Sequence, residues 1–197
     1  MGTIPHALET VYAWLYGYEN AVVESTKAFN RVIDKAVPRI ALIDYANKEV
    51  DDSVRTADAL EGRLYGVRID TCGENVMQGA SANGNHKDAK YWFGAGVTVS
   101  GVYAVRKALD EAGHEDVKII LSSGFGEPEK VRAFVKAEKE LGIKLFDALG
   151  VGGVFPARMS TMDIVAVGED RYNLKPMAKV GRGYHPNKRL ELVLGKC

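Results

Sequence analysis

Cysteine is scarce in this sequence. Only Cys72 and Cys197 occur, they form no CxxC pair, and they belong to no cluster with the spacing of metal ligands. A disulfide scaffold or a zinc module needs more cysteine than this. We therefore expect a protein of a reducing compartment, the cytoplasm, with no residue acting as a metal ligand.

An excess of charge of one sign and long apolar runs are also missing. Lysine plus arginine and aspartate plus glutamate each number 26, so nothing indicates binding to nucleic acid or to an anionic membrane. The longest apolar runs, around 40–43 and 117–121, have the length of a strand and not of a membrane span. Residues 1–6 do not resemble a secretory signal.

The apolar residues that are present switch repeatedly between helical and strand periodicity. With 46% apolar residues in 197, the chain can bury the core of one domain. Apolar strands are predicted at 39–44, 64–70, 117–121 and 145–149, and amphipathic helices between them. This alternation indicates parallel βαβ units, whose strands are covered on both faces.

The first helix and the C-terminal tail have their own patterns. Leu8, Val11, Tyr12 and Leu15 predict one apolar face on the first helix, with no strand before it. Segments 162–167 and 174–180 flank a polar turn and predict an antiparallel hairpin. We therefore divide the chain into an α/β portion, 1–160, and a β-rich C-terminal appendage, 161–197.

The number of predicted strands is small for a closed barrel. An eight-stranded α/β barrel takes about 250 residues, whereas only four core strands are predicted here. The fold is thus either an open doubly wound sheet or a partial, irregular parallel α/β barrel. A partial barrel leaves strand edges uncovered and needs a partner chain or a second copy.

Polar or glycine residues follow each predicted strand, at the end where parallel α/β proteins place their active sites. These ends are Asp44, the pair Arg68 and Asp70, residues 122–124 and residues 150–153. Arg68 and Asp70 are two residues apart, so they lie on one face of their strand. We expect the four strand ends to form one functional rim.

Two of these ends suit a phosphate group. Residues 122–124 (SSG) precede a helix that begins near Pro128, and residues 150–153 (GVGG) follow the next strand. Small residues let backbone N–H groups approach an oxyanion, and a helix N-terminus adds positive potential. Neither segment is a dinucleotide fingerprint or a Walker A motif. The pair predicts a phosphate cradle.

The histidines and one long loop are less specific. His6 begins the first helix and is either a turn residue or a functional one, while His86, His114 and His185 are expected to be solvated. Residues 72–96 are too many for an ordinary connection after a strand. They form either a lid, a substrate-specific insertion or packing filler.

Six segments, in the same order, resemble successive motifs of nicotinate phosphoribosyltransferases. They are 2–8 (GTIPHAL), 43–44 (ID), 66–71 (GVRIDT), 117–125 (VKIILSSGF), 150–153 (GVGG) and 175–181 (KPMAKVG). The resemblance runs over nearly the whole chain but corresponds only to the C-terminal half or so of a family member. Residues 71–74 (TCGE) depart from the family's usual continuation.

The resemblance implies a type II phosphoribosyltransferase fold, which is related to the TIM barrel. It implies that nicotinate and 5-phosphoribosyl 1-pyrophosphate are joined, with ATP hydrolysis and Mg²⁺, to give nicotinate mononucleotide in NAD biosynthesis. The implied partners are these small molecules and either a homo-oligomer or a chain that supplies the missing N-terminal half.

The resemblance also assigns residues. His6 matches the histidine that accepts phosphate from ATP, and Arg68 and Asp70 match the strand-end pair beside the phosphoribosyl group, so these three are the expected catalytic residues. The expected substrate- and phosphate-binding residues are Thr3, Asp44, Ser122, Ser123, Gly124, Gly150, Gly152 and Gly153.

Three other interpretations stay open. Quinolinate phosphoribosyltransferase has the same barrel, uses a substrate with two carboxylates, releases CO₂ and needs no ATP; the Gly-Thr-x-x-His motif argues against it. The chain could instead be a non-catalytic phosphosugar-binding or assembly subunit. An aldolase would need a lysine at a strand's carboxyl end, and Lys118 begins its strand.

Overall fold

The structure is a computed structural model that describes residues 2–152, 154 and 162–186, and the side chains from residue 4 onward. Among these residues, no helix is long and apolar enough to cross a membrane.

A parallel five-stranded sheet organises the fold, and its strands lie in chain order. They are β1 (Gly2–Thr3), β2 (Arg39–Leu42), β3 (Gly66–Ile69), β4 (Lys118–Leu121) and β5 (Ala148–Leu149). The expected parallel α/β fold is confirmed. The expectation that no strand precedes the first helix is wrong, because Gly2 and Thr3 pair with Arg39 and Ile40. A two-residue strand is too short to show a periodic pattern.

Helices connect the strands and begin and end largely where the sequence indicates. They are α1 (His6–Tyr16), the 3₁₀ turn η1 (Tyr18–Asn20), α2 (Ala21–Val32), α3 (Glu49–Leu60), α4 (Ala89–Trp92), α5 (Val99–Glu111) and α6 (Pro128–Leu141). Pro128 lies in the first turn of α6, and Gly142 ends it in the left-handed region at φ 65°.

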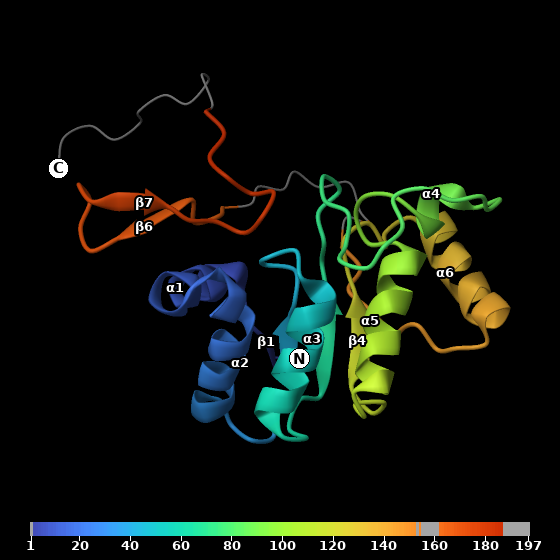
Figure 1. Cartoon of the computed structure of the whole chain (residues 1–197), viewed down its shortest axis with the longest axis horizontal. Helices are drawn as coiled ribbons and strands as arrows, with labels where there is room; N and C mark the ends of the chain where they lie inside the picture. Colours follow the sequence, from blue (N-terminus) through green and yellow to red (C-terminus); the bar gives the residue numbers. More distant parts are fainter. Residues whose placement is uncertain (1, 153, 155–161, 187–197) are drawn as a thin grey trace.

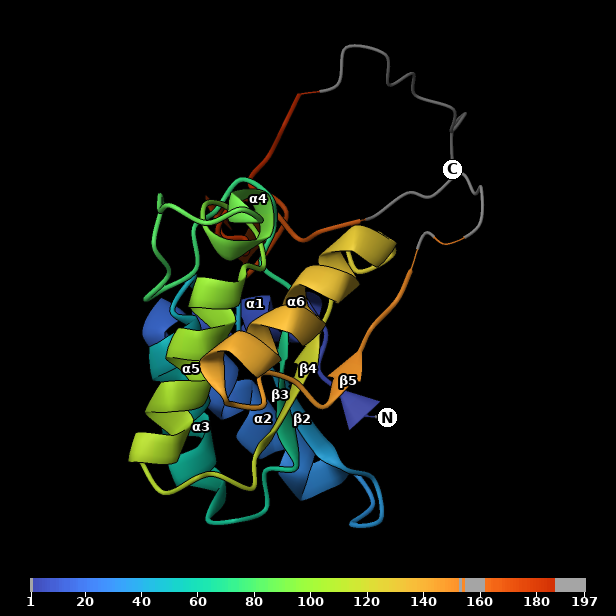
Figure 2. The ribbon, with the colours of Figure 1, turned by 90° about the vertical axis from the view of Figure 1, so that its right-hand side faces the viewer.

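The hydrophobic core lies between the sheet and helices that cover one of its faces (Figure 2). Side chains alternate along a strand, so Ala41, Val67 and Ile119 join this core while their neighbours face the other way. Leu42 and Arg68 are among these neighbours, and both line a cavity on the opposite face. A parallel sheet with helices on one face and a cavity on the other has the arrangement of part of a barrel wall.

The first helix does not bury the face that the sequence predicts. Glu9, Thr10 and Ala13 are its buried residues. Val11 is 40% exposed and Leu15 is 58% exposed. Apolar spacing shows that a helix has an apolar face, but it does not show which surface that face meets.

The long segment after β3 is folded against the helices, with α4 above α6 in Figure 1. Within it, Val76 and Gly96 form a parallel bridge. His86 stacks on Trp92 at 4.1 Å between ring centroids and contacts Glu140. His114 contacts Asp58 at 2.7 Å. The expectation of solvated histidines is therefore wrong for His86 and His114, each 19% exposed, whereas His185 is exposed as expected.

The expected C-terminal hairpin is confirmed as the antiparallel pair β6 (Ala166–Gly168) and β7 (Leu174–Pro176). It lies beside α1 (Figure 1). The chain then returns to the rim of the sheet, where the Tyr18 hydroxyl donates to the Ala178 carbonyl at 2.5 Å and the Val180 N–H donates to the Tyr45 carbonyl at 2.9 Å. The expected division between residues 160 and 161 lies outside the described residues.

Candidate active site

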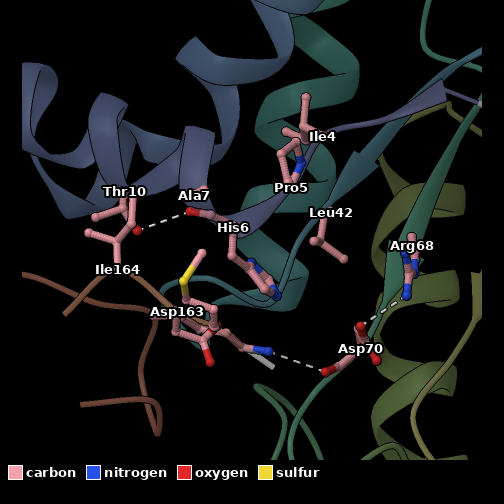
Figure 3. Close-up of a pocket in the computed structure, with 12 residues that line it drawn as sticks. Ile4, Pro5, His6, Ala7, Thr10, Leu42, Arg68, Asp70, Asp163 and Ile164 are labelled. Carbon is pink, nitrogen blue, oxygen red and sulfur yellow. Dashed lines mark hydrogen bonds and ion pairs between the residues drawn. The ribbon is translucent and has the colours of Figure 1, made fainter. Parts of the chain in front are cut away.

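A cavity of about 420 Å³ opens at the carboxyl ends of the strands, bounded by the first helix and the C-terminal segment. Its lining comes from segments far apart in the sequence: Ile4, Pro5, His6, Ala7, Thr10, Leu42, Arg68, Asp70, Met162, Asp163, Ile164 and Lys179. Figure 3 shows His6 on one wall, with Arg68 and Asp70 on the other. The three expected catalytic residues therefore share one cavity.

Arg68 and Asp70 form an ion pair at the end of β3. An Arg68 side-chain N–H donates to Asp70 Oδ2 at 3.0 Å, and both side chains are about one-third exposed. Arg68 Nε donates to Ser122 Oγ at 2.8 Å, and the Ser122 hydroxyl donates to the Ile69 carbonyl at 3.1 Å. Ser122, which follows the neighbouring strand, thus orients Arg68. The Arg68 guanidinium and the Asp70 carboxylate both line the cavity.

His6 is held by a carboxylate on its own helix. Its Nδ1 lies 2.6 Å from Glu9 Oε2, and its backbone carbonyl accepts a hydrogen bond from Thr10 Oγ1 at 3.0 Å. The other ring nitrogen, Nε2, lies 3.5 Å from Asp44 Oδ1. That distance is too long for a strong hydrogen bond.

Asp44 also binds a lysine from the C-terminal segment. Lys179 Nζ forms an ion pair with Asp44 Oδ2 and donates to the Asp70 carbonyl at 3.3 Å. Both Asp44 and Lys179 are buried. Lys179 therefore ties residues 177–181 to the strand ends and places a cation beside the imidazole.

Burial controls the protonation of this cluster. It lowers the pKa of His6 from 6.5 to about 3, with help from the Lys179 charge, so the imidazole is neutral at physiological pH. Burial raises the pKa of Glu9 well above its usual value, and Asp44 adds to this effect. It also raises the pKa of Asp44, which Lys179 opposes.

The 122–124 loop leaves two backbone N–H groups without a partner among the described residues. Ser123 and Gly124 both adopt positive φ, 67° and 81°, and no hydrogen bond among the described residues uses their backbone N–H groups. Lys130 Nζ donates to the Ser123 carbonyl at 2.9 Å. None of residues 122–124 lines the 420 Å³ cavity; the loop is linked to it only by the hydrogen bond between Ser122 and Arg68.

The second glycine segment is only partly brought to the site. The Gly150 N–H donates to the Leu121 carbonyl at 2.7 Å, and a Cβ at Gly150 would lie 3.1 Å from Ser122 Cβ. Gly152 has no described atom near its Cβ position, and Gly153 lies outside the described residues. The backbone of Thr3 lies in β1; its side chain is outside the described part.

Sequence reasoning missed Glu9, Asp163 and Lys179. The apolar spacing of the first helix does not predict a buried acid at Glu9. Lys179 lies 135 residues along the chain from its partner Asp44. The one available signal was segment 175–181, which includes Lys179 and resembles the family's closing motif. That resemblance does not show where Lys179 lies in the fold.

The described residues contain no group of three or more histidine, cysteine, aspartate or glutamate side chains that could hold a metal ion. Asp70 and Asp163 line the cavity and offer carboxylate oxygens. Asp70 pairs with Arg68 at 3.0 Å and Asp163 with Arg182 at 3.6 Å, so these carboxylates suit only a Mg²⁺ ion that arrives on a phosphate and keeps several waters.

One comparison with solved structures carries weight. The crystal structure of nicotinate-nucleotide pyrophosphorylase from Pyrococcus furiosus matches with a TM-score of 0.55 and 30% sequence identity, over 92% of this chain and 37% of that enzyme. No protein-family model and no curated protein matches the sequence. The chain therefore resembles part of the barrel of a type II phosphoribosyltransferase and spans little more than a third of that enzyme's length.

Proposed function

We propose that this chain is the phosphoribosyl-binding part of a type II phosphoribosyltransferase that acts on a pyridine carboxylate. The observation that carries the proposal is the convergence of His6, Arg68 and Asp70 on one cavity at the strand ends. The likeness to the Pyrococcus furiosus enzyme supports it.

The charges in the cavity suit the chemistry. When the bond between ribosyl C1 and pyrophosphate breaks, positive charge grows on the ribose and negative charge on the leaving group. The Asp70 carboxylate stabilises the first, and the Arg68 guanidinium stabilises the second. Asp70 and Asp163 would hold Mg²⁺, which offsets charge on the pyrophosphate. The free N–H groups of Ser123 and Gly124 are the candidate cradle for the 5′-phosphate.

Two pyridine substrates are in question, and different observations favour each. The name of the matched enzyme favours quinolinate, so the likeness supports this alternative better than the nicotinate expected from the sequence motifs. The surroundings of His6 favour nicotinate with ATP, because a neutral imidazole beside a lysine suits a phosphate acceptor.

The first experiment measures binding of phosphoribosyl pyrophosphate to this chain by isothermal titration calorimetry, with Mg²⁺ present. We expect wild type to bind and Arg68→Met to weaken binding at least about tenfold, since a hydrogen bond to a charged group contributes about 1.5–3 kcal/mol. Arg132→Met is the matched control, because Arg132 also pairs with a carboxylate, Glu129 at 2.7 Å, on an exposed helix surface. Failure of wild type to bind would refute the proposal.

The second experiment identifies the acceptor. Turnover is measured with quinolinate labelled in the leaving carboxyl, with nicotinate, and with nicotinate plus ATP. Release of labelled CO₂ without ATP supports the quinolinate reaction, whereas ATP-stimulated nicotinate mononucleotide formation supports the other. Binding without any turnover indicates that the rest of a longer enzyme is required, or that the chain is a phosphosugar-binding subunit.

A further inference from the structure

A second cavity, of about 330 Å³, lies where α4 meets α5 and α6 (Figure 1). The long segment 72–96 supplies Gly79, Ser81, Trp92 and Phe93 to its wall, and α5 supplies most of the rest. Among the described residues, it shares none with the 420 Å³ cavity at the strand ends. Its size and its mainly apolar, aromatic lining are typical of small-molecule sites. The segment after β3 therefore shapes a hollow large enough for a ligand.

Direct contacts between segment 72–96 and α5 hold the walls of the second cavity. Gly79 adopts φ 77°, and a Cβ there would lie 2.8 Å from Ala104 Cβ, so the loop backbone rests directly on the helix. The Ser81 N–H donates to Ser100 Oγ at 3.2 Å, and the Ser81 carbonyl accepts from the Gly94 N–H at 3.0 Å. The cavity is thus formed before a ligand arrives, which lowers the ordering cost of binding.

Three aromatic side chains line the second cavity: Trp92, Phe93 and Tyr103. The rings of Trp92 and Phe93 lie 6.3 Å apart, and His86 supports Trp92 at 4.1 Å between ring centroids. Tyr103, on α5, is 36% exposed. Aromatic rings gain free energy by offset stacking or edge-to-face contact with another ring, beyond the area they bury. The lining therefore favours a flat, aromatic ligand over a flexible aliphatic one.

The charge at the second cavity is positive. Among the described residues, Lys107 is the only charged one that lines it. Lys107 Nζ pairs with Glu111 at 3.5 Å, but both side chains are more than half exposed, so this pair contributes little free energy and can open. The hydroxyls of Ser81 and Ser100 line the same cavity and can donate hydrogen bonds. An acidic group on a ligand would thus meet a cation and hydroxyl donors.

We propose that the second cavity binds a planar aromatic anion of one or two fused rings, with the rings against Trp92 and Tyr103 and the acidic group at Lys107. A neutral ring would leave the cation without a partner, and an aliphatic acid would leave the aromatic faces without one. Because the two cavities share no described residue, binding here is independent of the proposed phosphoribosyl site.

The test titrates the full chain, labelled with ¹⁵N, with 2-naphthoate and follows the indole N–H signals in ¹H–¹⁵N spectra. The sequence has two tryptophans, Trp14 and Trp92, so a Trp14→Phe sample assigns both signals. We expect 2-naphthoate to shift the Trp92 signal, with a dissociation constant of about 1 mM or lower. Trp14 lies on α1 and does not line the second cavity, so its signal should stay in place.

Two comparisons separate the contribution of the charge from that of the rings. The neutral isostere 2-naphthamide should bind wild type about two- to fivefold more weakly than 2-naphthoate, and Lys107→Met should bind both probes equally. Lys27→Met is the matched control, because Lys27 on α2 also pairs with a glutamate of its own helix, Glu24 at 2.7 Å. Tyr103→Ala should weaken both probes at least about threefold, whereas Tyr172→Ala, at an exposed position, should not.

Three results would overturn the proposal. They are an unshifted Trp92 signal at about 10 mM 2-naphthoate, equal wild-type affinities for 2-naphthoate and 2-naphthamide, or a Trp92 signal that shifts with protein concentration alone. The last result would make the cavity an interface between copies of the chain. The two probes on wild type decide even if a variant does not fold. Because neither probe is a substrate of the proposed reaction, this test can fail while the proposed function stands, and the reverse also holds.

Discussion

At the scale of single residues, the site is defined by charges that have been taken out of water. Asp44 and Lys179 are both buried and pair with each other, and His6 and Glu9 lie directly beside them. Desolvation of such ions offsets much of their attraction, so a buried pair stabilises the fold little. Removing one partner, however, leaves the other charge buried and unpaired.

Lys179→Met tests this dependence. We expect it to lower the free energy of unfolding by about 3–5 kcal/mol, because Asp44 loses the one cation within ion-pair distance that the described residues supply. Urea denaturation measures the change. Adding Asp44→Leu should recover much of the loss, whereas Lys175→Met, on the exposed strand β7, should have little effect. An unchanged stability in Lys179→Met would contradict the buried pair.

Ser122→Ala tests the support of Arg68 without touching the cavity charge. The variant loses the acceptor for Arg68 Nε, and we expect about tenfold weaker binding of phosphoribosyl pyrophosphate, with the fold intact. Calorimetry measures the affinity. Ser100→Ala is the control, because its hydroxyl accepts a bond from the Ser81 N–H away from the cavity. Equal affinities in both variants would remove Ser122 from the site.

At the scale of elements, helix α3 buries an acid that has no hydrogen-bond partner among the described residues. Asp52 on α3 is 1% exposed, and neither of its carboxylate oxygens has a hydrogen-bond partner among the described residues. Arg55, one turn along, approaches only to 3.8 Å. Burial raises the pKa of Asp52 from 3.8 to about 7.

This shift has a definite sign. Between pH 4 and pH 7 the folded state keeps a proton on Asp52 that the unfolded state has lost, so this group makes stability fall as pH rises, by at most about 1.4 kcal/mol per pH unit. His6 acts oppositely over pH 3 to 6.5, because the unfolded state binds the extra proton there. The raised pKa values of Glu9, Asp44 and Glu49 act in the same direction as Asp52, so the total slope combines several groups.

Asp52→Asn isolates the effect by difference. Relative to wild type, its stability should improve progressively from pH 4 to pH 7 and then level off, as measured by urea denaturation across that range. Asp51→Asn, the exposed neighbour on the same helix, should follow the wild-type curve. Parallel curves for wild type and Asp52→Asn would show that Asp52 titrates normally.

At the scale of the whole molecule, the sheet ends in open edges. β1 and β5 each pair on one side only among the described residues, and α1 exposes Val11, Leu15 and Tyr16. Unpaired edges and exposed apolar side chains favour association. The chain spans 37% of the matched enzyme's length.

We therefore predict self-association or binding to a partner chain. Sedimentation velocity should show a species larger than the 21.5 kDa monomer, and Leu15→Lys with Val11→Lys should shift it toward monomer. Val135→Lys, an equally exposed position on α6, should leave the distribution unchanged. A compact wild-type monomer at micromolar concentration would contradict the prediction.

Local pattern was enough for much of the fold. Strand periodicity located β2, β3 and β4, and Pro128 and Gly142 marked the ends of α6, because these signals depend on neighbours in the chain. The strand-end rule placed Arg68 and Asp70 at one site, since the carboxyl ends of parallel strands share an edge. The sequence by itself therefore determined the α/β class and the part of the cavity wall that Arg68 and Asp70 form at the end of β3.

Only the tertiary structure decided the rest. The pairing of β1, the buried face of α1 and the meeting of Lys179 with Asp44 all depend on segments distant in the chain. Periodicity reports that a face is apolar, and it carries no information about which distant segment covers it. The charges around His6 come together because the C-terminal segment folds back across the strand ends, and no spacing between neighbouring residues encodes that return.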